Sequence, residues 1–488
     1  MKRIVVVGGG VAGLTTALHL KDRAGEISDG VEVVLLEGRD HVGGNIRTDR
    51  DDGWIVEWGP NGYLDNVPST PALVRRLGLD PHVQKANERA AKRFLFRNGR
   101  LHLLPANPLT FLRSPVLSVR GRLRVLLEPF SRSPDPDIDQ TIYDFGKRHI
   151  GAEAASVLID AMVSGVFAGN VHELSLASTF PKMAEMEAKH GSLVRAMLAR
   201  GKERRAARKR VSEMRARGEE VEELTQPGGP AGPGGTLTSF DDGLDVLVNT
   251  LSRELGDVVR LGSGVARVRR GGVDEAKPWN LVLEGGAGMQ ADVVVLAVPA
   301  APAASLIEQL DGDLASTMRG TPSAGLAVVA LGYEADSIGG PPDGFGFLVP
   351  RGAGPRILGC LWDSSLFPGR APAGNVLLRV MIGGAHDPEA VTLDDETLLG
   401  LVRSDLRTTM GIDADPVLTR VYRHSGGIAQ YTVGHRVRLD AIHERLARSP
   451  GLWVAGSSYY GVSMNLCIAK AGEQAGEILR YVKGDSEV

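Results

Sequence analysis

The sequence predicts an α/β (α+β) fold of several domains, one of which is discontinuous and draws on both ends of the chain. The chain has 488 residues, which is more than one hydrophobic core usually supports. Short apolar runs typical of buried parallel strands occur near both ends, next to stretches with a helical pattern. Residues 323–385 alternate strands with turns, which favours an antiparallel sheet, whereas residues 141–200 favour helices.

The N-terminal segment has the order strand, glycine-rich turn, helix. Residues 4–7 are a short apolar strand and residues 14–20 a helix, and the turn between them has the spacing Gly8-x-Gly10-x-x-Gly13. These glycines allow a tight turn, a close approach to a pyrophosphate and close packing of the helix on the strand. The helix N-terminus then presents unpaired N–H groups to the anion. The pattern predicts a Rossmann-like dinucleotide-binding domain.

The residues after the second strand indicate which dinucleotide binds. Residues 31–36 form that strand, and Glu37 ends it in a position to bond a ribose hydroxyl. Residues 39–48, with their Gly-Gly pair, resemble the extension found in flavoproteins of the amine oxidase, carotene desaturase and porphyrinogen oxidase superfamily. That resemblance implies FAD, held without a covalent bond; the alternative is an ordinary Gly-Gly turn between strands. Asn45 stands where amine oxidase relatives usually carry arginine.

Four local patterns follow before the helical region. Residues 53–63 read as an alternating strand that runs into a Gly-Pro turn, and a short helix is expected from Pro71 to Leu79. Residues 92–101 predict a hairpin with an Asn-Gly turn, and residues 131–139 a linker rich in Ser, Pro and Asp.

A charged segment and a Pro/Gly stretch interrupt the middle of the chain. Residues 201–224 carry a basic run and then an acidic one, and residues 227–235 are almost entirely Pro and Gly. We expect a solvated helix that leads into a loop. An anionic-membrane or partner site is the alternative, so the role of both segments stays open.

The second half returns to the nucleotide-binding domain. Helices are expected over residues 243–255 and 462–479, and strands over 258–268, 291–299 and 452–456. The second of these helices would place another N-terminus, with its positive dipole end, near the pyrimidine edge of a flavin.

Composition and cysteine usage exclude several classes of function. The net charge of −3 does not support nucleic-acid binding, and no apolar run approaches the roughly 18 residues of a membrane span. Because the chain starts with a strand rather than a signal peptide, a cytoplasmic location is expected. Cys360 and Cys467 are the only cysteines, so a dithiol–flavin reductase is excluded. No second dinucleotide motif is evident, and oxygen is therefore the simplest electron acceptor.

Over its whole length the chain resembles the oxygen-dependent, FAD-containing porphyrinogen oxidases of haem biosynthesis. The Gly-Val-Phe-Ala-Gly-Asn and Gln-Tyr-Thr-Val-Gly-His sequences are the most specific of the motifs. The motifs that carry the resemblance lie at residues 59–62, 164–175, 345–350, 430–435 and 455–465.

The resemblance implies roles for five substrate-binding residues. Arg93 matches an arginine that grips a substrate propionate, for which a guanidinium is well suited. Gly169 matches a glycine whose backbone lies against the macrocycle, and Leu348 and Phe367 match apolar residues on either side of the tetrapyrrole. Asn61 stands where some relatives carry arginine. Without the resemblance, Arg93 would be read as a surface arginine and the two apolar residues as core.

The resemblance and the glycine motifs together imply a set of cofactor-binding residues and a division into domains. The expected FAD contacts are Gly8, Gly9, Gly10, Val11, Ala12, Gly13, Glu37, Gly38, Gly43, Gly44, Asn45, Gly59, Pro60, Asn61, Gly62, Val265, Trp453, Gly456, Val462, Ser463 and Met464. The FAD-binding domain is expected over residues 1–70, 236–300 and 426–488, the substrate domain over 71–130 and 301–425, and a helical domain over 131–225.

The implied reaction is hydride transfer from a porphyrinogen to the flavin N5, followed by reoxidation with O2 to give H2O2. This reaction requires positioning rather than a catalytic acid, base or nucleophile, and the eleven histidines show no metal-ligand spacing. Protoporphyrinogen IX and coproporphyrinogen III both stay open as substrates. An amine oxidase, a carotenoid desaturase-like enzyme and a non-catalytic FAD-binding protein are the alternatives. Contact with the next haem-pathway enzyme, peripheral membrane contact, and a monomer or homodimer also stay open.

Overall fold

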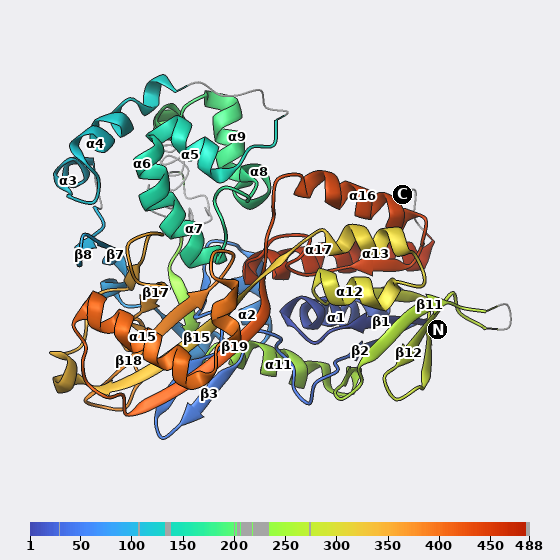
Figure 1. Ribbon diagram of the computed structural model, residues 1–488. Helices are drawn as coiled ribbons and strands as arrows, with labels where there is room; N and C mark the ends of the chain where they lie inside the picture. Colours follow the sequence, from blue (N-terminus) through green and yellow to red (C-terminus); the bar gives the residue numbers. More distant parts are fainter. Residues whose placement is uncertain are drawn as a thin grey trace.

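The structure is a computed structural model. It describes residues 1–28, 30–105, 108–131, 138–199, 201–202, 205, 217, 234–272 and 275–484. The charged segment and the Pro/Gly stretch in the middle of the sequence lie almost entirely outside the described residues. Figure 1 shows the helices from α3 to α9 gathered in one lobe above a large sheet, with the nucleotide-binding elements beside them.

Strands from distant parts of the chain form a five-stranded parallel sheet in the order β10-β2-β1-β14-β20. The strands are β1 (Lys2–Val7), β2 (Val31–Leu36), β10 (Val259–Arg260), β14 (Val293–Leu296) and β20 (Leu452–Val454). This confirms the α/β fold class and the strands expected at both ends of the chain.

Both faces of this sheet are buried, as expected for parallel strands. One face packs against helices α1 (Val11–Asp22), α11 (Asp245–Leu255) and α17 (Met464–Lys483). The other face packs against a small antiparallel sheet and three further helices. These elements are β11 (Val265–Arg270), β12 (Trp279–Leu283), β13 (Gly288–Ala291), α12 (Ala300–Ile307), α13 (Gly312–Arg319) and α16 (His435–Ala447).

Two element predictions are wrong in detail. The single strand expected over residues 258–268 is two strands, β10 and β11, in different sheets, because the chain turns at Gly262, where φ is +58°. The helix expected from Pro71 to Leu79 is α2 (Ser69–Arg76). A proline is accepted in the first turn because its missing N–H would have no intrahelical partner there.

A mixed seven-stranded sheet has the order β19-β15-β18-β17-β16-β7-β8. Its only parallel pair among the described residues is β16 with β7; the other neighbours are antiparallel. The hairpin expected over residues 92–101 is confirmed, and both turn residues have positive φ, +51° at Asn98 and +74° at Gly99. The strands are β7 (Arg93–Arg97), β8 (Arg100–Leu103), β15 (Ser323–Glu334), β16 (Gly346–Leu348), β17 (Ile357–Leu361), β18 (Asn375–Gly383) and β19 (Leu418–Ala429).

The two faces of the seven-stranded sheet are covered differently. Helix α15 (Asp395–Met410) covers one face, and its buried side chains form one hydrophobic core with those of the sheet. On the opposite face, the hairpin of β3 (Thr48–Asp51) and β4 (Trp54–Glu57) covers the β15, β18 and β19 end. The helical lobe covers the β7 and β16 end of that face. A strip between these two covers carries a further, smaller apolar cluster.

The helices expected over residues 141–200 form a lobe and are interrupted after α7. Helix α7 ends at Phe167, and Ala168 caps it in the left-handed region with φ +47°. The helices of the lobe are α3 (Pro108–Arg113), α4 (Val119–Leu126), α5 (Ile142–Ile150), α6 (Ala152–Ala154), a π-helical turn (Ala155–Ile159), α7 (Asp160–Phe167), α8 (Leu176–Thr179) and α9 (Pro181–His190).

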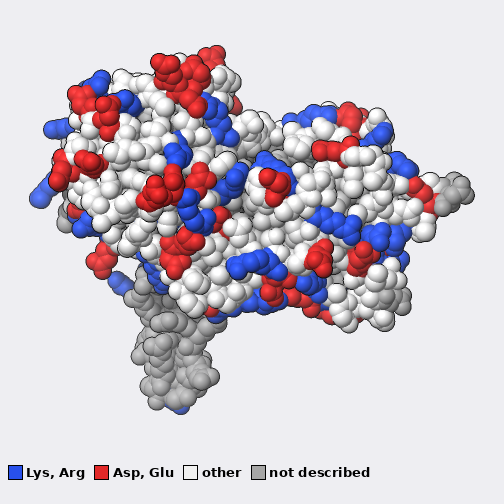
Figure 2. Space-filling view, turned by 90° about the horizontal axis from the view of Figure 1, so that it is seen from below, with Lys and Arg blue, Asp and Glu red and all other residues white. Residues whose placement is uncertain are grey.

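Short elements complete the described chain. They are β5 (Tyr63–Leu64), β6 (Val83–Lys85) and β9 (Leu237–Phe240), which form a three-stranded sheet, and helix α14 (Asp363–Leu366). Among the described residues no helix is both long and apolar enough to cross a membrane. On the face shown in Figure 2, basic and acidic side chains are interspersed.

Candidate active site

The first glycine loop forms a cradle at the end of β1. Gly8 has φ +109°, and its N–H donates to the Leu36 carbonyl at 2.8 Å. A Cβ on Gly13 would lie 2.0 Å from the Gly8 oxygen, so no side chain fits there. Gly10 caps α1 without a side-chain bond, and nothing lies within 4 Å of where its Cβ would be. The first amides of α1, at Val11 and Ala12, therefore have the open approach that a pyrophosphate needs.

Glu37 lies against the same loop. Its Oε2 accepts from the Gly9 amide at 2.7 Å, and its Oε1 accepts from the Arg39 amide at 2.9 Å. Each carboxylate oxygen retains a lone pair, so both could still accept from ribose hydroxyls. Gly38 follows directly and approaches Gly264, whose Cα would lie 3.3 Å from a Cβ at position 38.

The second glycine pair crosses over the first loop. The Gly43 amide donates to the Gly9 carbonyl at 2.8 Å, and Gly43 pairs with Gly10 as an isolated parallel bridge. Gly43 has φ +108° and a Cβ on it would lie 2.4 Å from the Ile46 carbonyl; Gly44 has φ +63°. This packing supports the flavoprotein resemblance over an ordinary turn between strands.

The Gly59–Gly62 loop joins the segment around Asn45 to the seven-stranded sheet. A Cβ on Gly59 would lie 2.5 Å from the Asn45 carbonyl, and one on Gly62 would lie 2.4 Å from the Thr238 carbonyl. The Asn45 side chain donates to the Gly427 carbonyl in β19 at 3.0 Å. Pro60 lies in the same loop, half-buried. The loop is therefore held between both domains.

The C-terminal segment approaches the start of α1, next to the first glycine loop. A Cβ on Gly456, which has φ +101°, would lie 3.7 Å from the Ala12 Cβ. Ser463 caps α17 by accepting from the Leu466 amide at 3.3 Å. Val462 packs against the cluster that contains Phe167 at the end of α7, so the cofactor domain and the helical lobe meet here.

Three expected FAD contacts lie half-buried around the core of the cofactor domain. Met464 and Trp453 pack against the core between the parallel sheet and helices α1, α11 and α17. Val265 packs against the core on the opposite face of that sheet. The Trp453 indole nitrogen is buried and has no partner among the described residues.

A network of buried charges lies beneath the Gly59–Gly62 loop, and the sequence did not predict it. Arg370 pairs with Glu57 at 3.2 Å and Arg379 pairs with Asp363 at 2.7 Å, with all four side chains at most 2% exposed. Burial raises the pKa of Glu57 and of Asp363, and the neighbouring guanidinium groups oppose that shift. An arginine inside the apolar strand 375–383 was the available signal, but its partner could not be identified from sequence.

An apolar wall occupies the strip between the two covers of the seven-stranded sheet. This name refers to a cluster of buried and half-buried side chains from the residue that caps α7 and from β15, β17, β18 and β19. Its members are Ala168, Ala324, Leu358, Met381 and Ile428. Ala168 lies in one of the motifs that carry the resemblance, whereas the other four were not singled out from sequence because they read as ordinary core residues.

The structure places the apolar candidates around the wall to different degrees. A Cβ on Gly169 would lie 2.6 Å from Leu174 Cδ1 and 2.7 Å from Gln430 Oε1, so this backbone is tightly enclosed. Leu348 is half-buried and packs against α7, where its Cδ2 would be 2.3 Å from a Cβ on Gly165. Phe367 is fully buried, with the Arg370 guanidinium 5.4 Å from its ring centroid. It lies inside the protein and not at the surface of the wall.

Arg93 lies at the exposed start of β7. It occupies the same strand face as Leu95, which packs toward the helical lobe. Its guanidinium lies 5.1 Å from the Phe345 ring centroid, and it forms no ion pair with any carboxylate in the described part of the chain. Arg97 on the same strand differs, because it pairs with Glu153 at 3.2 Å.

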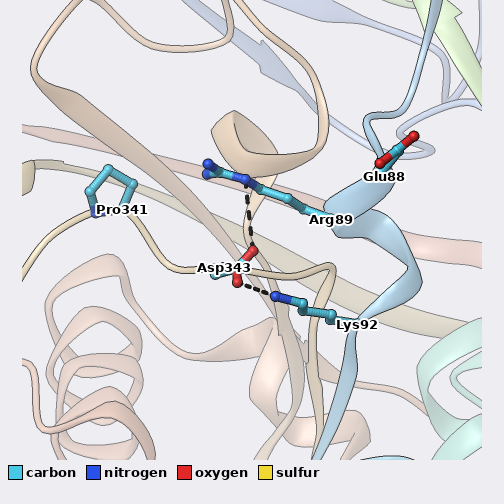
Figure 3. Close-up of a pocket in the computed structure, with 5 residues that line it drawn as sticks. All are labelled: Glu88, Arg89, Lys92, Pro341 and Asp343. Carbon is cyan, nitrogen blue, oxygen red and sulfur yellow. Dashed lines mark hydrogen bonds and ion pairs between the residues drawn. The ribbon is translucent and has the colours of Figure 1, made fainter. Parts of the chain in front are cut away.

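A surface hollow of about 630 Å³ lies just before β7 and does not include Arg93; it is lined by Glu88, Arg89, Lys92, Pro341 and Asp343. Figure 3 shows Arg89 and Lys92 reaching toward Asp343. The Arg89 Nε lies 3.7 Å from that carboxylate, and Lys92 also pairs with it. The hydrogen bond from Lys92 lowers the pKa of Asp343. Asp343 therefore pairs with both of these cations, whereas Arg93 has no carboxylate partner among the described residues.

Comparisons with known proteins cover nearly the whole chain. Residues 11–479 match the family model described as flavin containing amine oxidoreductase. The coproporphyrinogen III oxidase of Bacillus subtilis is 30% identical over 99% of this chain and 98% of its own length. The protoporphyrinogen oxidase of Bos taurus is 32% identical, with 98% of each chain covered. A solved structure from Exiguobacterium sp. 255-15, named provisionally as a protoporphyrinogen oxidase, matches with a TM-score of 0.81, 25% identity and 99% of each chain covered.

Proposed function

Because the chain belongs to the flavin-containing amine oxidoreductase family, we propose that it oxidises a porphyrinogen to the porphyrin in haem biosynthesis. It is an FAD-dependent oxidoreductase. The observation that carries the proposal is the similarity at about a third identity, over nearly the full length of both chains, to oxidases of coproporphyrinogen III and protoporphyrinogen. The apolar wall beside the cofactor loops supports it, since a tetrapyrrole is a broad apolar ligand.

The glycine loops fit the expected cofactor. Gly8 and Gly13 allow the tight turn and the close packing of α1, and the open space at Gly10 leaves a cradle at the α1 N-terminus for the pyrophosphate. The Glu37 oxygens, which already accept from two backbone amides, could still accept from ribose hydroxyls. Bound FAD supplies a two-electron acceptor for hydride. Val462, one of the expected FAD contacts, packs against the cluster at the α7 end of the helical lobe, so it would hold the cofactor where the two units meet.

The substrate residues position and shield the ring. The apolar wall excludes water from one face of the macrocycle. The lack of a side chain at Gly169 lets Leu174 and Gln430 pack against this part of the backbone. The unpaired guanidinium of Arg93 is suited to a propionate, through parallel N–H donors. The reaction produces an aromatic ring, so the chain mainly contributes orientation.

We propose oxygen as the terminal acceptor. Porphyrinogen and porphyrin differ by six electrons and six protons, which three molecules of O2 accept to form three of H2O2. The two cysteines are both buried and unpaired, so no dithiol among them passes electrons onward.

The experiment that tests the function uses purified, FAD-loaded protein. Coproporphyrinogen III and protoporphyrinogen IX are each added without oxygen, and flavin absorbance at the oxidised band is followed. Bleaching by at least one of them, and porphyrin fluorescence on admission of air, is expected. An aliphatic amine and a carotenoid serve as controls, because bleaching only by these would point to a different oxidase. No bleaching by any of them would make the chain a flavin binder. The ratio of turnover on the two porphyrinogens assigns the physiological substrate.

Peripheral membrane contact is a further proposal that the structure supports at α4. This helix and the turn after it expose several large apolar side chains toward solvent. They are Val119, Leu123, Leu126, Leu127 and Phe130. Co-sedimentation with phosphatidylglycerol vesicles tests it, and Phe130→Ser together with Leu127→Ser should abolish the vesicle-bound fraction. Binding that persists in this double variant would contradict the proposal.

A further inference from the structure

Asn61 has an acceptor that the protein itself does not satisfy. The residue is 8% exposed, and its Oδ1 is buried without a hydrogen-bond partner among the described residues. Its Nδ2, by contrast, donates to Asp363 Oδ1 at 3.1 Å. Buried polar atoms are almost always hydrogen-bonded in native proteins, so one left without a donor calls for a physical explanation.

The orientation of this amide is set by the buried charges. A carboxylate only accepts hydrogen bonds, so Asp363 selects the NH2 group of Asn61 and turns its carbonyl oxygen the other way. Asp363 is itself paired with Arg379, whose Nε lies 2.7 Å from its second oxygen. The same guanidinium donates from Nη1 to the carbonyls of Glu57 at 3.0 Å and Gly59 at 2.7 Å. One arginine thus orients both the backbone before Asn61 and the carboxylate that turns its side chain.

The location of Asn61 indicates which donor is missing. Its loop packs against Asn45 of the cofactor segment on one side and against β18 of the substrate sheet on the other. The N–H groups expected at that boundary belong to ring nitrogens, either of the flavin or of the pyrroles of a porphyrinogen.

We propose that Asn61 Oδ1 accepts a hydrogen bond from a ring N–H of the bound flavin or tetrapyrrole, and that Asp363 and Arg379 are positioning residues that present this oxygen. A tetrapyrrole donor rests on the proposed function, whereas a flavin donor rests only on membership of the family. Asn61 touches the ligand, and the other two residues act through it.

The first test is Asn61→Leu, which keeps the volume and removes the acceptor. The flavin midpoint potential, the release of FAD on dilution and the KM for coproporphyrinogen III are measured on the FAD-loaded protein. A tetrapyrrole donor predicts a KM raised about tenfold, the worth of one buried hydrogen bond, with an unchanged potential. A flavin donor predicts a shifted potential or faster release with an unchanged KM. A folded, flavin-loaded variant that changes neither would overturn the proposal.

Two further variants keep the test decisive if Asn61→Leu does not fold. Asn61→Asp retains an acceptor oxygen, and one proton shared with Asp363 would replace the amide hydrogen. Its flavin potential, FAD release and KM should match the wild type at about pH 6 and depart from it toward about pH 8, as the shared proton is lost. Wild-type values at every pH would refute the role of Asn61.

Asp363→Asn lets the amide of Asn61 pair in either orientation. It should change the same quantity as Asn61→Leu, in the same direction but by less. Wild-type readouts in this variant would remove Asp363 from the proposal. If the wild type fails to oxidise any porphyrinogen, the proposed function fails, while the potential still decides whether the flavin is the donor.

Discussion

Replacing Arg93 with alanine should weaken substrate binding with little effect on the stability of the protein. The guanidinium has no ion-pair partner among the described residues, so its removal breaks no ion pair of the folded state and loses the contact with the Phe345 ring, worth about 0.5–1 kcal/mol at an exposed site. If it binds a propionate, the variant loses one charge-assisted hydrogen bond, worth about 1.5–3 kcal/mol, or roughly a tenfold to hundredfold increase in KM. Arg93→Lys keeps the positive charge but not the paired N–H donors, so its KM should lie between those of the wild type and Arg93→Ala.

The matched control is Arg97→Ala on the same strand. Arg97 is committed to Glu153, so its loss should leave KM within about twofold of the wild type, since a partly exposed pair contributes little. Steady-state porphyrin fluorescence gives KM, and thermal unfolding with flavin content verifies the fold. The KM effect at Arg93 should shrink at high salt, because exposed charges are screened. An unchanged KM in Arg93→Ala, or an equal increase in Arg97→Ala, would refute the assignment of the propionate anchor.

Three further outcomes are expected. Gly13→Ala places a Cβ about where the Gly8 carbonyl lies, 2.0 Å away, so the variant should purify without flavin; a yellow, active product would contradict the cradle. Peroxide should accumulate at three molecules per porphyrin, measured with oxygen and porphyrin together in a sealed cell, and a ratio near one would reject oxygen as the acceptor at every step. In the helical lobe, burial raises the pKa of Glu128, but hydrogen bonds from Val194, Ser192 and His149 outweigh it and hold that pKa below its ordinary value. Such a carboxyl contributes stability above the unfolded pKa of about 4.3, and that stability is lost as the pH falls through the folded pKa. The protection factors of the α5 amides, which are exchange rates corrected for the intrinsic pH dependence of exchange, should therefore fall on acidification in the wild type, and much less so in Glu128→Gln. An equal fall in both proteins would assign the pH dependence elsewhere.

Local patterns in the sequence were sufficient to predict the N-terminal strand, glycine loop and helix. The features that predict this unit lie close together in the sequence. They are the strand over residues 4–7, the glycine spacing from Gly8 to Gly13 and the acid at Glu37. The Asn98-Gly99 hairpin was equally local, since its turn needs two residues that tolerate positive φ. Such features follow from backbone conformation and hydrophobic periodicity, which a single sequence displays.

The substrate half was decided by tertiary structure. Met381 and Leu358 read as core residues until the two covers of the seven-stranded sheet leave a strip between them. The carboxylate that neutralises Arg379 comes from α14, while the carbonyls it holds lie some 320 positions earlier in the chain. A buried charge is tolerated only where a partner satisfies it in three dimensions. Periodicity reports which face of an element is buried, but which distant side chain meets it there depends on how the elements pack.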